Sequence, residues 1–411
     1  MIPIDFLRRA SPELGLGFLL AFGSSVGQTY FISLFSGEIR ADLGLSHGNF
    51  GVLYTVATLA SGLLLLWLGK TADHIEIPTL GIITLLALAG FAALLANATT
   101  LLMLCVALFG LRLCGQGMLS HLSMTAMARW FDKERGRALS IAVLGYPAGE
   151  AVFPLLAALM LTLMTWREVW TSASFGVLVV MIPSSWILGR MISARRLDET
   201  ASADSIKSVP MRASWTRREV LRDARFYAVL PGLMAPPFII TGVLFHQVHL
   251  VETKKWALAE FAACYPLYAL SATVTALVCG WFVDRFGAAR LLPIYLIPLG
   301  CGLVLMAMTN TLTSAALFMV LMGATAGGAT IVLGALWAEL YGTDHLGSIR
   351  SLSIALLVLA TAISPGLMGQ LLDAGIQLET QFVVMAVYVA ACAIIFAVLL
   401  PGLATEKSPS P

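Results

Sequence analysis

Long apolar stretches, each near the length of a membrane helix, constrain this chain more than any other feature. A helix that crosses the hydrocarbon core of a bilayer needs about 20 mostly apolar residues. Cutting the sequence at its polar and Gly/Pro-rich joints leaves twelve such stretches. They cover approximately residues 14–36, 48–69, 78–97, 101–128, 138–162, 167–189, 227–250, 258–282, 291–309, 312–340, 348–372 and 379–400. The sequence therefore predicts an all-α polytopic membrane protein with twelve transmembrane helices.

Composition argues against several other classes of protein. Charged residues make up only 12% of the chain and hydrophobic residues 59%, whereas soluble domains carry about 25% charged residues. The near balance of 25 basic and 23 acidic residues argues against a nucleic-acid partner. The sequence lacks the usual motifs for nucleotide, zinc or calcium binding, so we expect no cofactor, no metal site and no ATP-driven transport by this chain. All six cysteines fall within apolar stretches, as small core residues do.

The distribution of positive charge predicts the orientation, because cytoplasmic loops carry an excess of Lys and Arg. With the N-terminus inside, 20 of the 25 basic residues lie on the inner side. The outer side has four, namely Arg40, Arg167, Lys254 and Lys255. We therefore expect both termini to be cytoplasmic, in the inner membrane of a bacterial-type cell. The one basic residue left over is Arg112, inside an apolar stretch.

Self-similarity at a fixed offset predicts an internal duplication. At 211 residues, four Gly, Asp and Pro positions match: Gly69 with Gly280, Asp73 with Asp284, Gly136 with Gly347 and Pro154 with Pro365. Each half then contains six spans, which predicts two pseudo-symmetric bundles at 1–189 and 227–411. The polar stretch 190–226 joins them as a cytoplasmic linker, with a short amphipathic helix expected at 215–225. A duplicated unit of this kind favours a monomer.

Two motifs resemble those of a known family. "GWFVDRFGAAR" (280–290) resembles the G-x-x-x-D-R-x-G-x-x-R loop motif of the major facilitator superfamily, and "RLCGQG" (112–117) is similar to the arginine motif in that family's fourth helix. "RWFDKERGRALSIAVLGYPAGEAVFP" (129–154) and "GQTYFISLF" (27–35) look most like its monocarboxylate and oxalate–formate branch. That branch commonly has a basic residue in the eighth helix, where 258–282 has none. The resemblance implies two six-helix bundles around a central cavity, secondary transport by alternating access, and no enzymatic activity.

The resemblance also implies gating roles for residues at the cytoplasmic loops. Asp73 and Asp284 would act as latches that close the cytoplasmic side, because a carboxylate can accept backbone N–H groups at a helix N-terminus. Arg129 or Arg137 would complete the charge cluster in the first half. Arg285 would do so in the second half.

Arg112 and Glu150 are the intramembrane charges that most strongly indicate function. An arginine at the centre of a membrane helix costs about 2.5–3.5 kcal/mol, so we expect another group to answer its charge. At 1.5 Å per residue Arg112 lies ~17 Å from the outer end of its span, near the midplane, and Glu150 lies at a matching depth in the next span. Consecutive antiparallel spans are usually neighbours, so the two could meet. Arg112 would bind an anionic group of the substrate, with Glu150 as counter-charge or proton carrier. A structural ion pair is the alternative.

Other polar residues in the spans are candidates for the lining of the cavity. Gln116 follows Arg112 by four residues and shares its helical face, and Tyr146 likewise precedes Glu150. The remaining candidates are Gln28, Tyr268 and Thr325 for substrate binding and His246 for proton access. For Gln28 the alternative is a hydrogen bond in helix packing, and for His246 it is an ordinary interfacial histidine.

Small residues predict two close helix contacts. Gly145 and Gly149 form a small-xxx-small pair on a different face of span five from Glu150, which would let another helix pack closely. "GATAGGAT" (323–330) in span ten would allow the same tight approach.

Together these features favour a secondary transporter for a small organic anion of the carboxylate type, with proton coupling. An efflux transporter for amphipathic drugs would share the fold but would need no positive charge at the midplane, and span five lacks the G-P-x-x-G-G stretch of the superfamily's antiporters. A membrane sensor that binds its ligand without moving it is a rival of another class, which flux in liposomes would separate. The expected partners are the anionic substrate, protons and the lipid bilayer.

Overall fold

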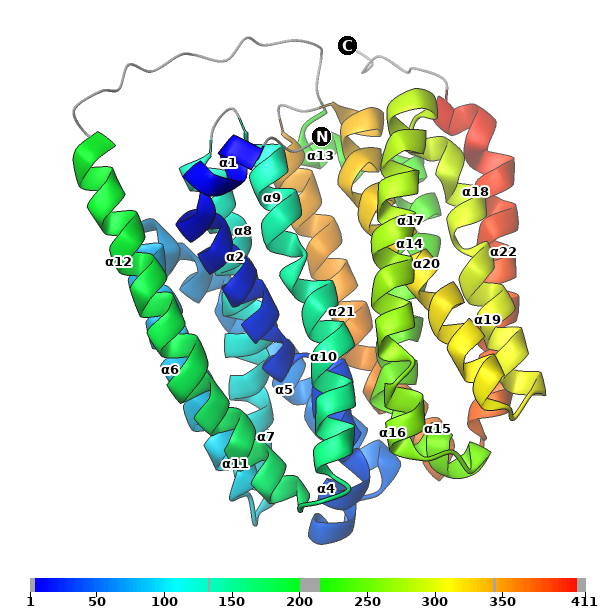
Figure 1. The fold of residues 1–411 in the computed structure, drawn as a ribbon. Coiled ribbons are helices and arrows are strands. Elements are labelled where there is room, and N and C mark those ends of the chain that lie inside the picture. The colour runs from blue at the N-terminus through cyan, green and yellow to red at the C-terminus, as the bar shows by residue number, and fades with distance from the viewer. Residues whose placement is uncertain (1–3, 132–133, 200–214, 343–344, 405–411) are drawn as a thin grey trace. The chain divides into compact units, whose positions relative to one another are not determined.

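The computed structural model describes residues 4–131, 134–199, 215–342 and 345–404. Within these ranges the ordered elements are helices, and eleven of them are long and apolar enough to cross a membrane. A bent pair, Ser11–Gly27 and Thr29–Leu43, turns by 43° and supplies a twelfth span. The all-α fold with twelve predicted spans is therefore confirmed (Figure 1).

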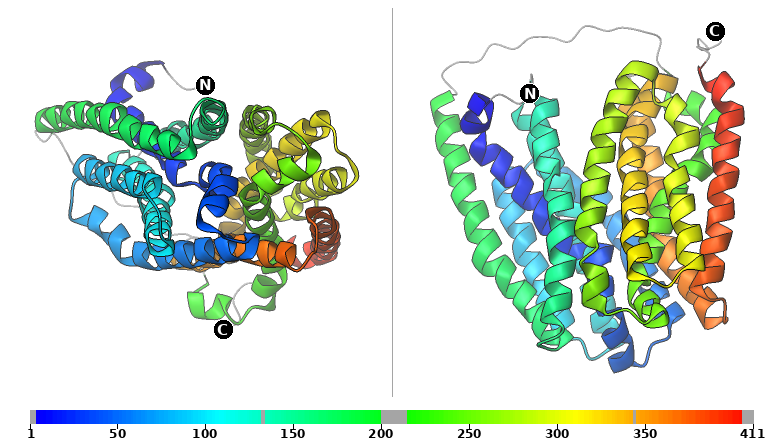
Figure 2. Two further views of the ribbon diagram at one scale, coloured as in Figure 1. Left: turned by 90° about the horizontal axis from the view of Figure 1, so that it is seen from below. Right: turned by 45° about the vertical axis from the view of Figure 1, so that its right-hand side comes forward.

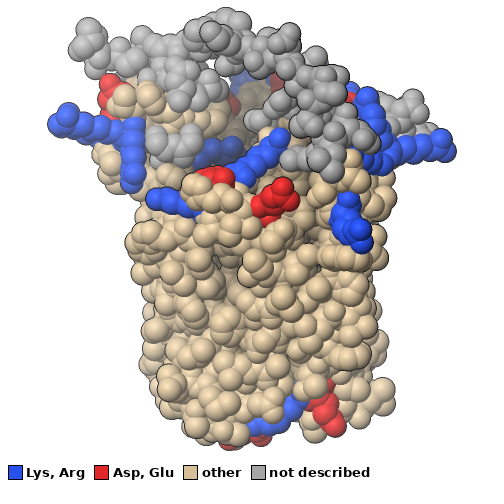
Figure 3. All heavy atoms as spheres, turned by 90° about the vertical axis from the view of Figure 1, so that its left-hand side faces the viewer, with Lys and Arg blue, Asp and Glu red and all other residues tan. Residues whose placement is uncertain are grey.

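The surface has the charge pattern of a protein that sits in a bilayer. On the face drawn in Figure 3, charged side chains gather toward the two ends and leave an uncharged band between them. Exposed side chains within the spans include large apolar ones such as Leu86, Phe175 and Val180. So much exposed apolar surface would be an aggregation risk in water, whereas it is the normal covering of a helix that faces lipid.

Contacts within the chain separate it into two units, Met1–Ile206 and Lys207–Pro411. Within each unit the long helices run alongside one another as a bundle (Figures 1 and 2). The first unit contains α1 (Ile4–Arg9), α2 (Ser11–Gly23), η1 (Ser24–Gly27), α3 (Thr29–Ile32), η2 (Ser33–Phe35), α4 (Ser36–Leu43), α5 (His47–Leu68), η3 (Gly69–Asp73), α6 (Ile77–Ala96), α7 (Leu101–Leu111), η4 (Arg112–Leu119), α8 (Ser120–Trp130), α9 (Arg135–Val143), α10 (Gly145–Met160), α11 (Trp166–Gly176), η5 (Val177–Met181) and α12 (Ile182–Glu199). The second contains α13 (Arg217–Val220), α14 (Ala224–Phe245), α15 (Gln247–Lys254), α16 (Leu258–Ala262), α17 (Tyr265–Phe286), η6 (Ala289–Leu291), α18 (Leu292–Tyr295), α19 (Ile297–Met308), α20 (Leu312–Tyr341), α21 (Leu346–Asp373) and α22 (Leu378–Ala404).

The stretch between the sixth and seventh spans is more helical at its start and less helical at its end than predicted. α12 continues to Glu199, and the helix predicted at 215–225 is only α13. Thr216 and Glu219 form a capping box that starts α13, and the Thr216 N–H and hydroxyl hold the pKa of the Glu219 carboxyl below its usual range. Asp223 then caps the start of α14, because its side chain accepts the Arg225 N–H at 3.0 Å. This second N-cap is why the predicted helix ends early.

Helix boundaries repeat at the predicted offset of 211 residues. α15 begins and ends at positions equivalent to those of α4, and α20 begins at the equivalent of the start of α7. Thr100 and Thr311 cap α7 and α20 in the same way, each hydroxyl accepting a backbone N–H three residues later. The left-handed residue that ends α4 is Gly44 (φ 63°), and its equivalent after α15 is Lys255 (φ 60°). The duplication is thus confirmed in the local structure.

The two predicted small-residue contacts are also present. A Cβ placed on Gly145 would lie 2.4 Å from the Phe18 carbonyl oxygen of span one. A Cβ on Gly149 would lie 1.9 Å from a side-chain atom that also belongs to span one. In the second unit, Cβ atoms on Gly323 and Gly327 would come within 2.3 and 2.1 Å of carbonyl oxygens of α17. α10 therefore packs on span one, and α20 packs on α17, at distances that only glycine permits.

Candidate substrate and gating sites

The first membrane span is broken near its middle. η1 ends at Gly27, Gln28 is extended (φ −84°, ψ 152°), and the helix resumes as α3. Carbonyl groups at such a break lose their helical partners. Gly27 lies against Gly115 of span four, so closely that a Cβ on Gly27 would approach the Leu111 carbonyl oxygen to 2.1 Å. The break is thereby held directly against span four.

Arg112 of span four binds this break. Its Nη1 donates to the Gly27 carbonyl oxygen at 3.1 Å and to Thr29 Oγ1 at 3.3 Å. The hydroxyls of Thr29 and Tyr54 are hydrogen-bonded to each other at 2.8 Å, and the guanidinium lies over the Tyr54 ring, 5.2 Å from its centroid. Arg112 is 2% exposed. A cation at the carbonyl end of a helical segment is favourable, so these contacts partly answer the charge of Arg112.

One edge of the Arg112 guanidinium has no hydrogen-bond partner. Among the described residues, nothing accepts from Nε or Nη2, although both atoms are buried. These two N–H groups point the same way along one side of the planar guanidinium and match the two oxygens of a carboxylate. A buried donor without an acceptor is costly, so this edge is a candidate site for an anionic ligand.

Arg112 begins a π-helical segment, η4, rather than a regular α-helix. Such segments are rare and are often found at functional sites. The prediction that Gln116 shares the face of Arg112 assumed 3.6 residues per turn, which a π turn exceeds. Gln116 is partly exposed and makes no side-chain hydrogen bond to the described part of the chain.

The predicted ion pair between Arg112 and Glu150 is not formed. Among the described residues, no ion pair or hydrogen bond involves the Glu150 carboxylate. The two spans do pack together where α8 meets α9, but α10, which carries Glu150, packs on α2, η1 and α3 of span one. The prediction failed because this segment packs mainly on span one rather than on span four. Tyr146, one turn before Glu150, is partly exposed on the same helix.

The candidates in the second unit lie in packed surroundings. Thr325 is fully buried, and its hydroxyl donates to the Leu321 carbonyl oxygen of its own helix at 3.4 Å. Tyr268 is buried where α17 meets α20. His246 is buried at the junction of α14 and α15, and its Nε2 is 3.1 Å from the Pro365 carbonyl oxygen. Since a carbonyl oxygen only accepts, Nε2 carries the proton in this contact.

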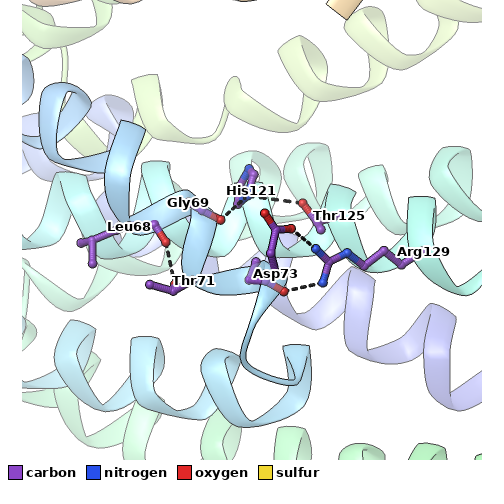
Figure 4. Close-up of polar contacts among 8 residues, drawn as sticks. Leu68, Gly69, Thr71, Asp73, His121, Thr125 and Arg129 are labelled. Atoms are coloured by element: carbon purple, nitrogen blue, oxygen red, sulfur yellow. Dashed lines mark hydrogen bonds and ion pairs between the residues drawn. The ribbon is translucent and has the colours of Figure 1, made fainter.

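The gating residues of the first half come together as predicted for Asp73 and Arg129. Arg129 donates to the Asp73 carboxylate and to the Ala72 carbonyl oxygen, and so joins the end of α8 to η3 (Figure 4). His121, two turns earlier on α8, lies 3.2 Å from the Gly69 carbonyl oxygen in the same view. Arg137 is not part of this cluster, because it faces Glu134 at 3.4 Å. Both partners of the Asp73 pair are partly solvent-exposed.

The equivalent loop of the second half is held by a different residue. Gly287 ends α17 with φ 86°, and the Glu339 carboxylate of α20 accepts the backbone N–H groups of Ala288 and Ala289. Asp284 is exposed and makes no ion pair within the described ranges, and Arg285 lies over the rings of Trp281 and Phe286 instead. The predicted Asp284–Arg285 charge cluster is therefore not formed.

Three residues of these sites were missed by the sequence analysis. Tyr54 and Thr29 surround Arg112, and Glu339 holds the second loop. Tyr54 carries a usable signal, because a tyrosine, Tyr265, stands at its equivalent position 211 residues on, and both are fully buried. Glu339 could have been noticed as an acidic residue at the inner end of an otherwise apolar span. Nothing in the sequence marks Thr29, because the break beside it carries no proline.

Comparisons with known proteins agree with this architecture. The family model described as Major Facilitator Superfamily matches residues 17–272 and 238–411. No curated protein matches the sequence. Among solved structures, a bacterial homologue of the human lysosomal transporter Spinster, in an inward-facing and unoccupied conformation, has a TM-score of 0.70 at 13% identity and covers 97% of this chain and 99% of its own.

A second structural relative is the nucleoside transporter NupG, in a mutant form. Its TM-score is 0.71 at 12% identity, over 96% of this chain and 100% of that one. At these identities the likeness extends to the fold and not to the substrate, so the monocarboxylate-like branch stays a prediction. The family match covers nearly the whole chain. The chain therefore belongs to the major facilitator superfamily and is a multi-pass membrane transporter, not an enzyme.

Proposed function

We propose that this transporter carries a small organic anion with a carboxylate group across the cytoplasmic membrane, with proton coupling and both termini in the cytoplasm. The observation that carries the proposal is the buried Nε–Nη2 edge of Arg112, which has no acceptor within the described residues. A guanidinium edge binds a carboxylate through two parallel charge-assisted hydrogen bonds. The equivalent of Arg112 in the second half is Gly323, so recognition of the anion falls to the first half.

Glu150 is the proposed proton carrier. It lies within a membrane span and has no cationic partner among the described residues. Taking an unpaired carboxylate out of water is costly, and taking up a proton removes that cost. In this proposal Arg112 binds the charge of the substrate and Glu150 carries the proton. The two residues lie on different helices, η4 and α10, which both pack on span one.

A thermal-stability panel tests the substrate class. The thermal stability of the purified wild type, Arg112→Gln and Arg112→Lys is measured in the presence of small carboxylates, neutral solutes or lipophilic cations. A ligand at a hundredfold excess over its Kd stabilises the folded state by about 2.7 kcal/mol. We expect a carboxylate to stabilise the wild type, to lose most of this effect in Arg112→Gln and to lose about half of it in Arg112→Lys. Equal stabilisation of all three forms by cations or neutral solutes would reject the anion site.

Proton coupling is tested by flux in liposomes with an imposed pH gradient. We expect the gradient to drive uptake of the carboxylate found in the panel. In Glu150→Gln the gradient should no longer drive it, while exchange of labelled for unlabelled substrate continues. A pH-driven flux that survives this change would assign the proton to another residue.

Arg129→Gln is expected to reduce flux several-fold while leaving stability nearly unchanged. An exposed ion pair contributes only about 0.2–1 kcal/mol to folding, so the effect should come from the loss of the latch between α8 and η3. Flux in liposomes and the thermal midpoint would be measured on the same preparation. Arg137→Gln is the matched control, because Arg137 is a nearby arginine outside the Asp73 cluster. Equal losses in the two variants would show that only the charge of the inner face matters.

Glu339→Gln is expected to impair transport more than Asp284→Asn does. Glu339 accepts two backbone N–H groups at the turn after α17, whereas Asp284 has no ion-pair partner among the described residues. Hydrogen bonds to a charged acceptor contribute about 1.5–3 kcal/mol, so the neutral amide should hold this turn less firmly. A larger loss of flux in Asp284→Asn than in Glu339→Gln would instead assign the latch role to Asp284.

A further inference from the structure

Spans one and seven both end in a short helix at the outer side. Span one bends by 43° between Ser11–Gly27 and Thr29–Leu43, and its outer end is α4. Span seven is interrupted at His246 (φ −94°, ψ 19°), and its outer end is α15. Each of these end helices has eight residues and stops at a left-handed residue. They are the same feature repeated in the two halves.

A polar tie fastens α4 to its own bundle. Asp42 Oδ2 accepts from Trp166 Nε1 at 2.9 Å and lies 3.4 Å from Arg167 Nη2. The same Nη2 donates to the Ala98 carbonyl oxygen at 3.0 Å. The tie therefore joins three elements, namely α4, the start of α11, and the loop between spans three and four.

The second unit has a tie at the same place with the charges exchanged. Lys254 Nζ donates to Asn310 Oδ1 at 2.7 Å and lies 3.1 Å from Glu379 Oε1. The Asn310 carbonyl oxygen accepts from Trp256 Nε1 at 2.9 Å. Again the end helix, the start of the last span and the loop after the third span of the half are joined. Here the end helix supplies the cation and the last span the carboxylate, which reverses the first tie.

The two ties differ in exposure to water. The side chains of Lys254 and Glu379 are 2% and 26% exposed, whereas those of Arg167 and Asp42 are 34% and 45% exposed. Exposed ion pairs are weak and are screened by salt. A pair with one buried member is screened less, and breaking it leaves the charge of Lys254 uncompensated away from water. The tie on α15 is therefore the firmer of the two.

We propose that these ties are paired outer fasteners that hold α4 and α15 to their bundles, and that their release lets the ends of spans one and seven bend independently during transport. The α4 tie releases first, because it is exposed, and the α15 tie second. The proposal uses the orientation given under the proposed function only to place these helices on the outer side. It does not depend on the substrate.

Spin labels within one bundle test the proposal directly. In a background without native cysteines, one pair of labels is placed at Glu252 and Thr380, on α15 and α22, and another at Ala41 and Thr171, on α4 and α11. We expect one narrow distance distribution for the first pair in the wild type. Glu379→Gln should broaden it, and exchanging the charges with Lys254→Glu plus Glu379→Lys should narrow it again. Lys255→Gln is the control, since it removes a neighbouring charge outside the tie.

Salt separates the two ties. Raising the ionic strength from 0.1 to 1 M shortens the Debye length from about 10 Å to about 3 Å, so the α4–α11 distribution should broaden while the α15–α22 distribution does not. Asn310→Ala, which removes one of the two acceptors of Lys254, should give a smaller broadening and keeps the test open if Glu379→Gln does not fold. An unchanged distribution in both variants, or equal broadening by Lys255→Gln, would overturn the proposal. Because no substrate is used, neither result bears on Arg112.

Discussion

Replacing Arg112 with glutamine is expected to lower the affinity for the transported carboxylate by about 100-fold. Two hydrogen bonds to a charged acceptor are lost, together worth about 3 kcal/mol, and each 1.4 kcal/mol is a factor of ten. Arg112→Lys keeps the charge but not the paired N–H groups, so we expect an intermediate loss of about tenfold. The measurement is the concentration of carboxylate that gives half-maximal flux in liposomes.

The same substitution is expected to reduce stability, because Arg112 also holds the break in span one. Without its Nη1, the Gly27 carbonyl oxygen loses that donor, at a cost of about 1–3 kcal/mol. Tyr54→Phe separates the two effects, since it removes the hydroxyl that bonds Thr29 but leaves the guanidinium in place. We expect it to lower stability by less than Arg112→Gln and to leave carboxylate binding within a few-fold. If Tyr54→Phe abolished binding as fully as Arg112→Gln, the hydroxyl itself would be part of the site.

Gly27→Ala is expected to be among the most damaging small substitutions in the first half. The added Cβ would lie 2.1 Å from the Leu111 carbonyl oxygen and 2.7 Å from Gly115 Cα, both backbone atoms that cannot turn away. Overpacking of this kind costs about 1–3 kcal/mol and occasionally more, and here we expect the upper end. Separating spans one and four would also move the Gly27 carbonyl away from Arg112, so that transport falls with stability.

Gly90→Ala is the matched control for this substitution. Gly90 lies within α6, and a Cβ there would meet nothing within 4 Å. Alanine is favoured over glycine in helices by up to about 1 kcal/mol, so Gly90→Ala should keep or raise the thermal midpoint. A Gly27→Ala protein with the midpoint and flux of the wild type would mean that the two spans can separate without cost.

The spans and the duplication could be predicted from the sequence because they depend on local signals. Stretches of apolar residues give the helices, and Thr100 and Thr311 mark the start of the same helix in both halves. The pair of Asp73 and Arg129 could also be predicted, because the resemblance to the family assigns both residues to one charge cluster on the cytoplasmic side. These features require no knowledge of which helix packs on which.

The surroundings of Arg112 could not be predicted, because they depend on helix neighbours and on a break. Chain order made spans four and five the expected neighbours of Arg112 and Glu150, whereas α10 packs on span one. The interruption at Gln28 supplies the carbonyl that Arg112 binds, and no proline marks it. Thr325 is likewise a polar residue of the kind that can line a cavity, although its hydroxyl is hydrogen-bonded within its own helix.

The π-helical turn in span four changes how the two halves correspond. Span four (Leu101–Trp130) and α20 begin and end at equivalent positions, but η4 lies only in the first. A π turn closes over five residues rather than four, so beyond it each side chain takes the direction that the preceding residue would have in an α-helix. Arg129 thereby shares its direction with Glu339, whose equivalent by sequence is Ala128. Both residues hold the loop after the second span of their half. The two duplicated helices therefore share one function, but residues at adjacent sequence positions and of opposite charge perform it.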